Sequence, residues 1–275
     1  MRLATILLVT ALLPLSVVAQ PQLDTETVWK EFLQWYKAAP AQVSEAAFPE
    51  EAYRAKLLKD GVPEAEVTRR YVLLSKLESE RTEALEIWFN HVFAREKPSF
   101  RTEPNVLLME TVKDLKPGRA LDVAMGQGRN AIWLASLGWD ATGFDISDEG
   151  LAAARATAEK KGLKIEAVHS GWQNFNFGKE QWDLIVLSYA FVPIGDAAFV
   201  ARLRASLKKG GLIVFEHFLL DGPNSPPKFT GIPEPNELPR LFLPDFRILR
   251  YEDTVAVSEW FPRKAPLVRM VARKL

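Results

Sequence analysis

The sequence predicts an α/β fold: a seven-stranded, mostly parallel sheet with helices on both faces and a terminal antiparallel hairpin, preceded by an N-terminal helical extension. After Pro98, short β-rich runs alternate with helical stretches, a pattern typical of parallel sheets. The last two β-rich runs have no helix between them, which favours an antiparallel hairpin. Before Pro98, apolar residues recur at the spacing of helical turns.

Composition excludes several classes of protein. The chain has 275 residues, of which 48% are hydrophobic and 25% charged, so a disordered or fibrous protein is excluded. Its 35 basic and 35 acidic residues balance, which argues against a nucleic-acid partner. The chain has no cysteine, which excludes disulfides, thiolate nucleophiles and sulfur-ligated metals. No group of acidic residues and histidines has metal-ligand spacing, and we expect no metal.

Residues 1–19 have the features of a secretory signal peptide. Arg2 precedes an apolar run that extends to Val18, with small residues before Gln20. The run is shorter than the roughly 20 residues of a spanning helix, and Pro14 interrupts it. We therefore expect cleavage before Gln20, export to the periplasm or the medium, and no membrane span after cleavage. The alternatives are an uncleaved anchor, or a cytoplasmic protein if the signal assignment is wrong.

Residues 20–99 predict the helical extension. Asp24 can cap a first helix that has large apolar side chains on one face, namely Val28, Trp29, Phe32 and Tyr36. Pro49 begins a second helix and Gly61 ends it. Pro63 begins a third helix, whose apolar face is interrupted at Glu78 and Arg81, so a division into two helices is an alternative.

Residues 100–275 predict the sheet domain. The expected strands are 120–124, 140–144, 165–169, 184–187 and 212–215, and the expected hairpin is 246–251 with 267–272. Helices are expected near 130–137, 147–161 and 196–207. Residues 221–239 contain six prolines, which predicts a long loop.

A glycine-rich turn is the most informative segment. The expected strand at 120–124 leads to Gly126 and Gly128 at the start of a helix, where backbone can approach a ligand. Asp145 ends the next strand, where a carboxylate can accept hydrogen bonds from ribose hydroxyls. Because Gly126, Gly128 and Ala131 also satisfy a dinucleotide fingerprint, the glycines alone leave an NAD(P)-dependent oxidoreductase open.

Four motifs around this turn resemble those of class I S-adenosylmethionine-dependent methyltransferases. They are Leu121 to Asn130, Gly143 to Ser147, Trp182 to Ser188 and Leu207 to Ile213. Within that family the chain, from about Phe100 to its end, is most similar to the tellurite-resistance and thiopurine-type branch of small-molecule enzymes. The resemblance implies a Rossmann-like fold and S-adenosylmethionine as cofactor. Two departures are Ala124, where the family often has glycine, and Ser170-Gly171-Trp172, where an acidic residue is usual.

The resemblance also implies which residues bind the cofactor. Asp122 would orient the turn and the methionine amino group, and Ser188 would face the methionine end. Asp145 would bind the ribose from an exposed position, and Ile146 would pack on adenine. Gly171 and Trp172 would meet the adenine edge. The turn itself would supply Met125, Gly126, Gln127, Gly128 and Asn130.

Methyl transfer is an in-line displacement that needs a base only when the nucleophile starts protonated. The candidate catalytic residues at the strand ends are Tyr189 and His217, and His217 is the better base because of its ordinary pKa. A structural role for His217 is the alternative. The candidate substrate-side residues are His91, in the aromatic segment 88–93, and Arg101, Glu103 and Asn105, just before the sheet domain.

We interpret the aromatic residues of the extension as a lid over the methyl group. A lid favours a small soft or weakly basic acceptor, such as a thiol, a chalcogen oxyanion or an amine. The segment Ser188 to Phe191 lacks the tetrad by which amino-methylating nucleic-acid enzymes grip a flipped base. Because S-adenosylmethionine is made in the cytosol, an exported, non-catalytic protein that binds an adenosyl ligand is a further alternative. The sequence does not indicate the oligomeric state.

Overall fold

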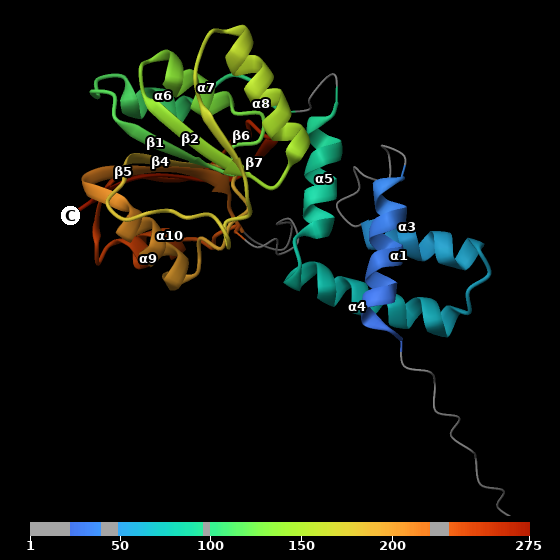
Figure 1. Cartoon of the computed structure of the whole chain (residues 1–275). Helices are drawn as coiled ribbons and strands as arrows, with labels where there is room; N and C mark the ends of the chain where they lie inside the picture. The colour runs from blue at the N-terminus through green and yellow to red at the C-terminus, as the bar shows by residue number, and fades with distance from the viewer. Residues whose placement is uncertain (1–22, 40–48, 96–99, 221–230) are drawn as a thin grey trace, which may run out of the picture.

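A computed structural model describes residues 23–39, 49–95, 100–220 and 231–275 of the chain (Figure 1). The expected signal peptide lies outside these residues. None of the helices within them is long and apolar enough to cross a membrane.

A seven-stranded sheet forms the centre of the larger domain, as predicted. Its strands are β1 (Arg119–Val123), β2 (Asp140–Asp145), β3 (Glu166–His169), β4 (Trp182–Ser188), β5 (Leu207–Phe218), β6 (Phe246–Val257) and β7 (Lys264–Lys274). The order across the sheet is β3-β2-β1-β4-β5-β7-β6. β1 to β5 pair in parallel, and β7 is antiparallel to both β5 and β6. This is a Rossmann-like sheet with the expected terminal hairpin.

Helices cover both faces of this sheet (Figure 1). On one face lie α6 (Val106–Val112), α7 (Arg129–Ser136) and α8 (Asp148–Lys160), and on the other lie α9 (Ala197–Ser206) and α10 (Glu237–Phe242). Each face has its own buried core. Leu121 and Phe215 belong to the core under α9 and α10, while Leu184 and Val214 belong to the core under α6, α7 and α8. Alternation of side chains along each buried strand produces this division.

Two helices were not expected from the sequence. α6 is short and begins at Asn105, whose side chain accepts a hydrogen bond from the Leu108 amide, so capping and burial rather than a long period define it. α10 lies at the end of the proline-rich stretch that we predicted to be a loop. Pro239 is tolerated because it lies in the first turn, where amides have no partner within the helix.

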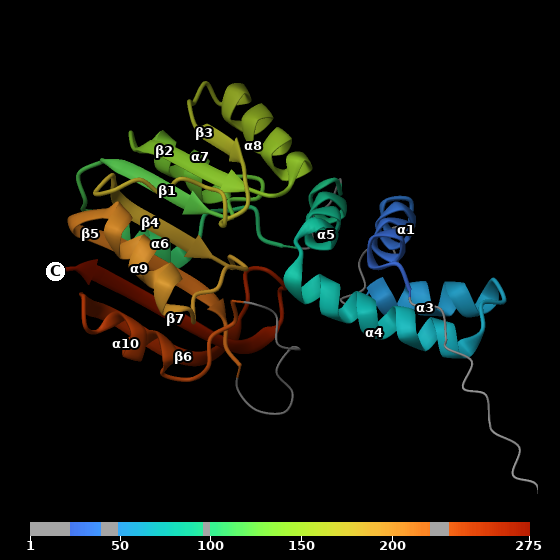
Figure 2. The ribbon, with the colours of Figure 1, turned by 60° about the horizontal axis from the view of Figure 1, so that its bottom comes forward.

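The described residues of the extension form four helices beside the sheet domain (Figure 2). They are α1 (Thr25–Lys37), α3 (Pro49–Lys59), α4 (Glu64–Glu80) and α5 (Glu83–Phe93). The four apolar residues expected on one face of the first helix are all buried. The third predicted helix is divided after Glu80, because Arg81 has extended backbone.

Glu50 and Glu78 place two carboxyl groups inside the extension. Burial, together with the charge of Glu50, raises the pKa of Glu78 to about 9. A carboxyl group whose pKa is raised by folding takes up a proton on folding, so stability falls as pH rises from about 5 toward that value. We expect Glu78→Gln to raise the melting temperature at pH 8 and to flatten its dependence on pH. Glu80→Gln, at an exposed site in the same helix, should change neither, and equal effects would contradict this reasoning.

Candidate functional site

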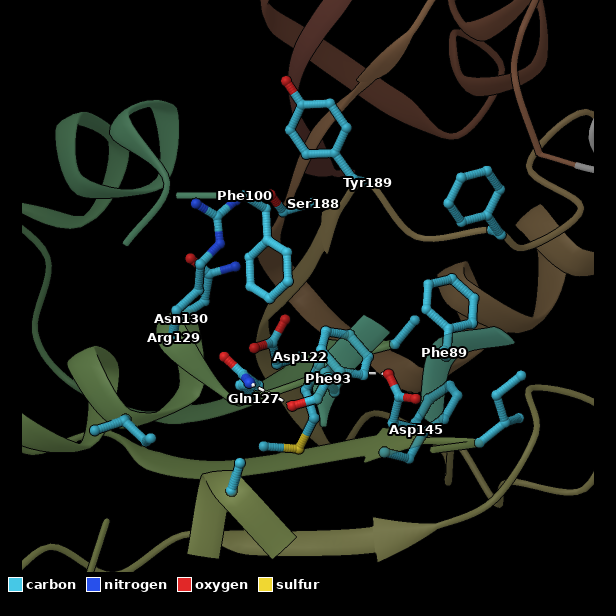
Figure 3. Close-up of a pocket in the computed structure, with 18 of the residues that line it drawn as sticks. Phe89, Phe93, Phe100, Asp122, Gln127, Arg129, Asn130, Asp145, Ser188 and Tyr189 are labelled. Carbon is cyan, nitrogen blue, oxygen red and sulfur yellow. Dashed lines mark hydrogen bonds between the residues drawn. The ribbon is translucent and has the colours of Figure 1, made fainter. Parts of the chain in front are cut away.

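A cavity of about 390 Å³ opens at the carboxyl ends of β1, β2 and β4. Cofactor sites of open α/β sheets lie at this edge, and this volume falls in their usual range. The glycine-rich turn, the end of β2, α5 and an aromatic group around Phe100 and Trp260 line it (Figure 3). The cavity thus joins the sheet domain to the extension.

The glycine-rich turn takes the conformation that its sequence predicts. Gly126 and Gly128 have φ angles of 52° and 72°, which glycine adopts without steric cost, and Gly128 precedes the first residue of α7. Ala124 also has a positive φ, 53°, at the position where the resembled family often has glycine. Asp122 accepts a hydrogen bond from the Ala131 amide at 3.1 Å, and burial raises its pKa to about 7. Asp122 therefore holds the turn in place while it lines the cavity.

Asp145 lies at the cavity, but it is not the exposed residue that we expected. It is 5% exposed. Its carboxylate accepts hydrogen bonds from the amides of Gly126 and Ser147, both at 2.8 Å. Burial raises its pKa to about 6. Asp145 thus fixes the glycine turn to the end of β2, and its replacement will also reduce stability.

The remaining expected cofactor residues divide by position. Most of them line the cavity, namely Met125, Gln127, Asn130, Ile146, Trp172 and Ser188. Gly128 and Gly171 are not among the lining residues; Gln127 and Arg129 line the cavity beside Gly128, and Ser170 and Gln173 line it near Gly171. The Gly171 carbonyl accepts hydrogen bonds from the amides of Asn174 and Phe175, so its backbone shapes the loop.

Helix α5 of the extension packs directly against the glycine-rich turn. A Cβ atom added to Gly126 would lie 2.6 Å from Cζ of Phe93, and one added to Gly150 would lie 2.9 Å from Cδ2 of the same ring. Gln127 donates a hydrogen bond to the Phe93 carbonyl at 3.1 Å. Asn90 accepts one from the Ser147 hydroxyl at 2.7 Å. Sequence reasoning missed Asn90, because nothing near it in the chain indicates that α5 and α8 meet.

The two expected catalytic residues do not fit that role. His217 is 0% exposed, neither ring nitrogen has a hydrogen-bond partner, and burial lowers its pKa to about 3. It is also absent from the described residues that line the cavity. Tyr189 lines the cavity, but its hydroxyl donates to Glu216 at 3.0 Å, and burial raises its pKa above the ordinary value. Neither residue is therefore positioned to act as a general base toward a substrate.

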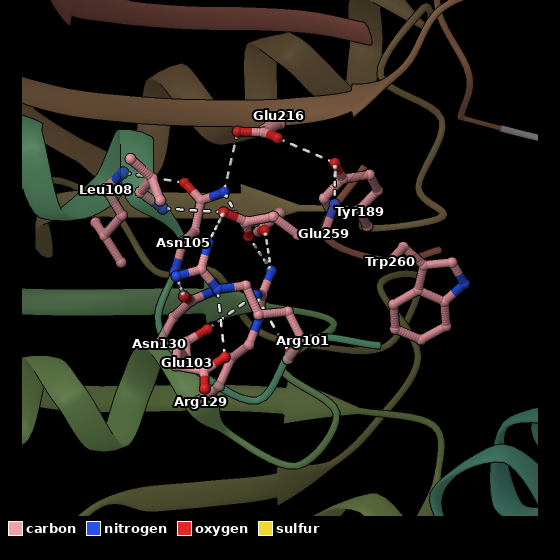
Figure 4. A network of polar contacts seen from close by, with 12 residues as sticks. Arg101, Glu103, Asn105, Leu108, Arg129, Asn130, Tyr189, Glu216, Glu259 and Trp260 are labelled. Atoms are coloured by element: carbon pink, nitrogen blue, oxygen red, sulfur yellow. Dashed lines mark hydrogen bonds and ion pairs between the residues drawn. The ribbon is translucent and has the colours of Figure 1, made fainter. Parts of the chain in front are cut away.

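The four expected substrate-side residues lie away from the cavity. His91 packs edge-on against Tyr36 inside the extension. Arg101, Glu103 and Asn105 belong to a polar network behind the cavity wall (Figure 4). Phe100, Thr102 and Pro104 of the same segment line the cavity in their place. Alternation along an extended segment directs neighbouring side chains to opposite sides, and the sequence does not show which side faces the ligand.

Glu86, Asp148 and His169 come together at the junction of α5 with the sheet domain. One ligand atom from each lies within 4.8 Å of the others. Because the three residues belong to three different elements, their spacing in the sequence did not indicate this group. Such partly exposed groups also occur without an ion, so the cluster by itself does not identify a metal site.

Replacing His217 tests its assignment as a buried structural residue. We expect His217→Phe to leave cofactor affinity within about threefold of the unaltered protein. Removing two buried nitrogens that lack partners can be neutral or stabilising when shape is kept. Calorimetric titration and thermal unfolding measure the two effects. A large loss of affinity without a loss of stability would restore His217 to the site.

Comparison with known proteins places this geometry among methyltransferases. Residues 120–211 match the family model described as a methyltransferase domain. The chain is 25% identical over 152 residues to a probable S-adenosyl-L-methionine-dependent methyltransferase, TehB, of Haemophilus influenzae, covering 54% of this chain and 52% of that protein. It is 33% identical over 100 residues to a ubiquinone biosynthesis O-methyltransferase of Roseobacter denitrificans, covering 35% and 39%. The match thus spans about half the length of TehB and a smaller share of the O-methyltransferase.

Solved structures show the same fold. The crystal structure of Haemophilus influenzae TehB matches with a TM-score of 0.51 and 24% identity, over 61% of each chain. A structure titled for the conversion of a disulfide bond into a thioacetal group during echinomycin biosynthesis matches with a TM-score of 0.55 and 18% identity, over 70% of this chain and 91% of that one. At these identities the likeness concerns the fold.

Proposed function

Because the chain belongs to the class I S-adenosylmethionine-dependent methyltransferases, in the branch that resembles TehB, we propose that it transfers a methyl group from S-adenosylmethionine to a small-molecule nucleophile. One observation carries the proposal: the glycine turn, Asp145 and several aromatic side chains line the same cavity. The relatives cover only part of the chain, so the acceptor is inferred from the cavity.

The residues present fit S-adenosylmethionine. Gly126 has room for no side chain because the Phe93 ring packs against it, so glycine lets the turn and α5 lie together at the cavity. Asp145 lines the cavity with a carboxylate whose remaining lone pairs can accept hydrogen bonds from ribose hydroxyls. Ile146 and Trp172 line the cavity and offer apolar surface for adenine, and we expect Asp122 and Ser188, which line it too, to meet the methionine end. Bound there, the cofactor supplies an electrophilic methyl group on a positively charged sulfur.

The protein's own contribution is alignment and exclusion of water. Among the described residues that line the cavity there is no histidine. The hydroxyl of Tyr189 is engaged with Glu216, so it holds its proton. Acceptors that attack through an existing lone pair, or that lose a proton readily to water, suit such a site. A thiol, a chalcogen nucleophile or an amine meets this condition.

We assign the extension to the same functional unit as a lid. Thr82, Leu85, Phe89 and Phe93 from the extension line the cavity. The aromatic rings of α5 lie against rings of the sheet domain, with Phe89 5.9 Å from Phe191 and Phe93 5.6 Å from Phe100. Their apolar surface shields the cavity from water, which favours a small acceptor over a macromolecule.

A ligand titration tests the proposed function. We expect S-adenosylhomocysteine to raise the melting temperature of the protein, and NAD⁺ and NADP⁺ to leave it unchanged. Methyl transfer to a panel of thiols, selenols and amines, followed by mass spectrometry, then tests catalysis. Stabilisation by a nicotinamide dinucleotide alone would favour an oxidoreductase. Ligand binding with no transfer to any nucleophile would favour a non-catalytic binding protein.

We also propose that the protein is exported, on the sequence of residues 1–19. Mass spectrometry of the N-terminus of protein from its native source should then show Gln20 as the first residue. An intact Met1 in that preparation would contradict export and would favour a cytoplasmic protein.

A further inference from the structure

An aromatic wall forms one end of the cavity, above the glycine turn (Figure 3). Its rings come from α5, from the segment before α6, from the end of β4 and from the β6–β7 connection: Phe89, Phe93, Phe100, Phe191 and Trp260. The rings of Phe100 and Trp260 are stacked, 4.9 Å apart at an interplanar angle of 6°. These rings lie in the same cavity as the glycine turn and Asp145, and under the proposed function we take this end as the acceptor end.

The arginine that lines the cavity is already paired. Arg129, in the first turn of α7, lines the cavity and is 15% exposed. Its guanidinium donates to the carbonyl of Glu103 at 2.9 Å and to the hydroxyl of Ser188 at 3.1 Å. The same group forms an ion pair with Glu259 at 2.8 Å. With a further hydrogen bond to the Arg101 carbonyl at 3.4 Å, Arg129 has four protein partners, including a carboxylate.

Glu259 connects this charge to the aromatic wall (Figure 4). Its side chain is 7% exposed, and besides Arg129 it accepts hydrogen bonds from the Asn105 side chain and the Val106 amide, both at 3.1 Å. Its carbonyl accepts a hydrogen bond from the Arg101 amide at 2.8 Å. Because Glu259 directly precedes Trp260, and Arg101 directly follows Phe100, these bonds fix both members of the stacked pair.

The described cavity lining supplies no second cation to the acceptor end. Among the described residues that line the cavity, the other cationic side chain is that of Lys161. Lys161 follows the last residue of α8, a helix of 13 residues that starts just after Asp145. It is therefore roughly 20 Å along that helix from the strand ends. An anionic acceptor would lose its hydration shell against aromatic rings without a free counter-charge, which is costly.

We propose that Arg129 and Glu259 are a positioning pair that holds the Phe100–Trp260 wall, and that the acceptor end selects an uncharged acceptor with an apolar body over an oxyanion. The proposal rests on the proposed function and narrows its acceptor class. In the transfer it implies for a thiol, the sulfur lone pair forms the new bond to the methyl carbon as the bond from that carbon to the sulfonium breaks. The sulfur keeps its proton during the transfer and loses it to bulk water as the product leaves, which gives a thioether and S-adenosylhomocysteine.

The first test uses two probes that differ by one charge. Benzyl mercaptan and 4-(mercaptomethyl)benzoate present the same thiol with and without a carboxylate, and selenite represents an oxyanion. Binding to the full chain saturated with S-adenosylhomocysteine is measured by ligand-observed NMR. We expect benzyl mercaptan to bind at least about tenfold more tightly than the carboxylate probe, and selenite not to displace it. Equal binding of the two thiols, or displacement by selenite, would overturn the proposal.

The second test removes the carboxylate that pairs with Arg129. We expect Glu259→Gln to weaken benzyl mercaptan binding by about tenfold, the scale of a lost hydrogen bond to a charged group. The same change should strengthen binding of the carboxylate probe, while affinity for S-adenosylhomocysteine stays within about twofold. Glu180→Gln, which removes an exposed carboxylate paired with Lys274, is the matched control and should change none of these values. An unchanged preference in folded Glu259→Gln would refute the role of the pair.

A third variant tests the role of the aromatic wall even if Glu259→Gln does not fold. Trp260→Leu removes one ring of the wall but no charge, so it should weaken benzyl mercaptan more than the carboxylate probe, whose carboxylate is less costly to desolvate beside a smaller apolar wall. Equal weakening of both probes would contradict selection by the wall. Transfer assays with the same probes separate the two proposals. Failure to methylate either thiol, with the binding preference intact, counts against the proposed function alone, whereas transfer to both thiols at equal kcat/KM counts against this inference alone.

Discussion

Asp145→Asn is expected to lower the affinity for S-adenosylhomocysteine by about 10- to 100-fold. Hydrogen bonds from ribose hydroxyls to a carboxylate contribute about 1.5 to 3 kcal/mol each, and the neutral amide loses most of that contribution. Isothermal titration calorimetry measures the change directly. Asp140→Asn, at the exposed opposite end of the same strand, is the control and should keep full affinity.

The buried position of Asp145 adds two expectations. The variant amide retains one acceptor and turns a donor toward the amide of Gly126 or Ser147, so the free energy of unfolding should fall by about 1 to 3 kcal/mol. Burial raises the pKa of Asp145 to about 6, so affinity in the unaltered protein should decline as pH falls through that value. Asp145→Asn should lose this pH dependence. Undiminished affinity in the variant would remove Asp145 from the cofactor site.

Phe93→Ala is expected to reduce methyl transfer by at least about tenfold while cofactor affinity changes less. Its ring fills the space above Gly126 and Gly150 and stacks on Phe89 at 5.7 Å. Truncating a buried phenylalanine costs about 3 to 5 kcal/mol, which is large for the docking of one helix. Transfer to benzyl mercaptan and hydrogen exchange of the α5 amides should respond together.

Val72→Ala is the control for this change, because Val72 is 64% exposed on α4 and lies outside the cavity lining. It should preserve both activity and hydrogen-exchange protection. If Phe93→Ala undocks α5, as judged by rapid exchange, and methyl transfer nevertheless continues at the full rate, the extension is not a lid.

Local patterns were sufficient for most of the secondary structure. Alternation of β-rich and helical runs determined the sheet domain, and the 3.6-residue period determined the buried face of α1. The sequence did not predict α6 and α10, because neither helix is long enough to show a helical period of apolar residues. Each is stabilised by its cap or by packing. The position of β7 between β5 and β6 is consistent with the expected hairpin, whose order in the sheet depends on pairing between distant segments.

The sequence by itself determined the glycine turn and the acid at the end of β2, and the resemblance of the surrounding motifs to a known family indicated the class of cofactor. These features lie within the short consecutive segment β1-turn-α7-β2, where local patterns show each element. Only the tertiary structure decided what surrounds them. His217 is buried away from the cavity, and Asn105 belongs to the polar network behind the cavity wall. Phe93 and Trp260, which are far apart in the sequence, lie together at the same cavity. The physical reason is that burial and contact between distant segments set the pKa, the orientation and the reach of a side chain, and none of these can be read from its neighbours in the chain.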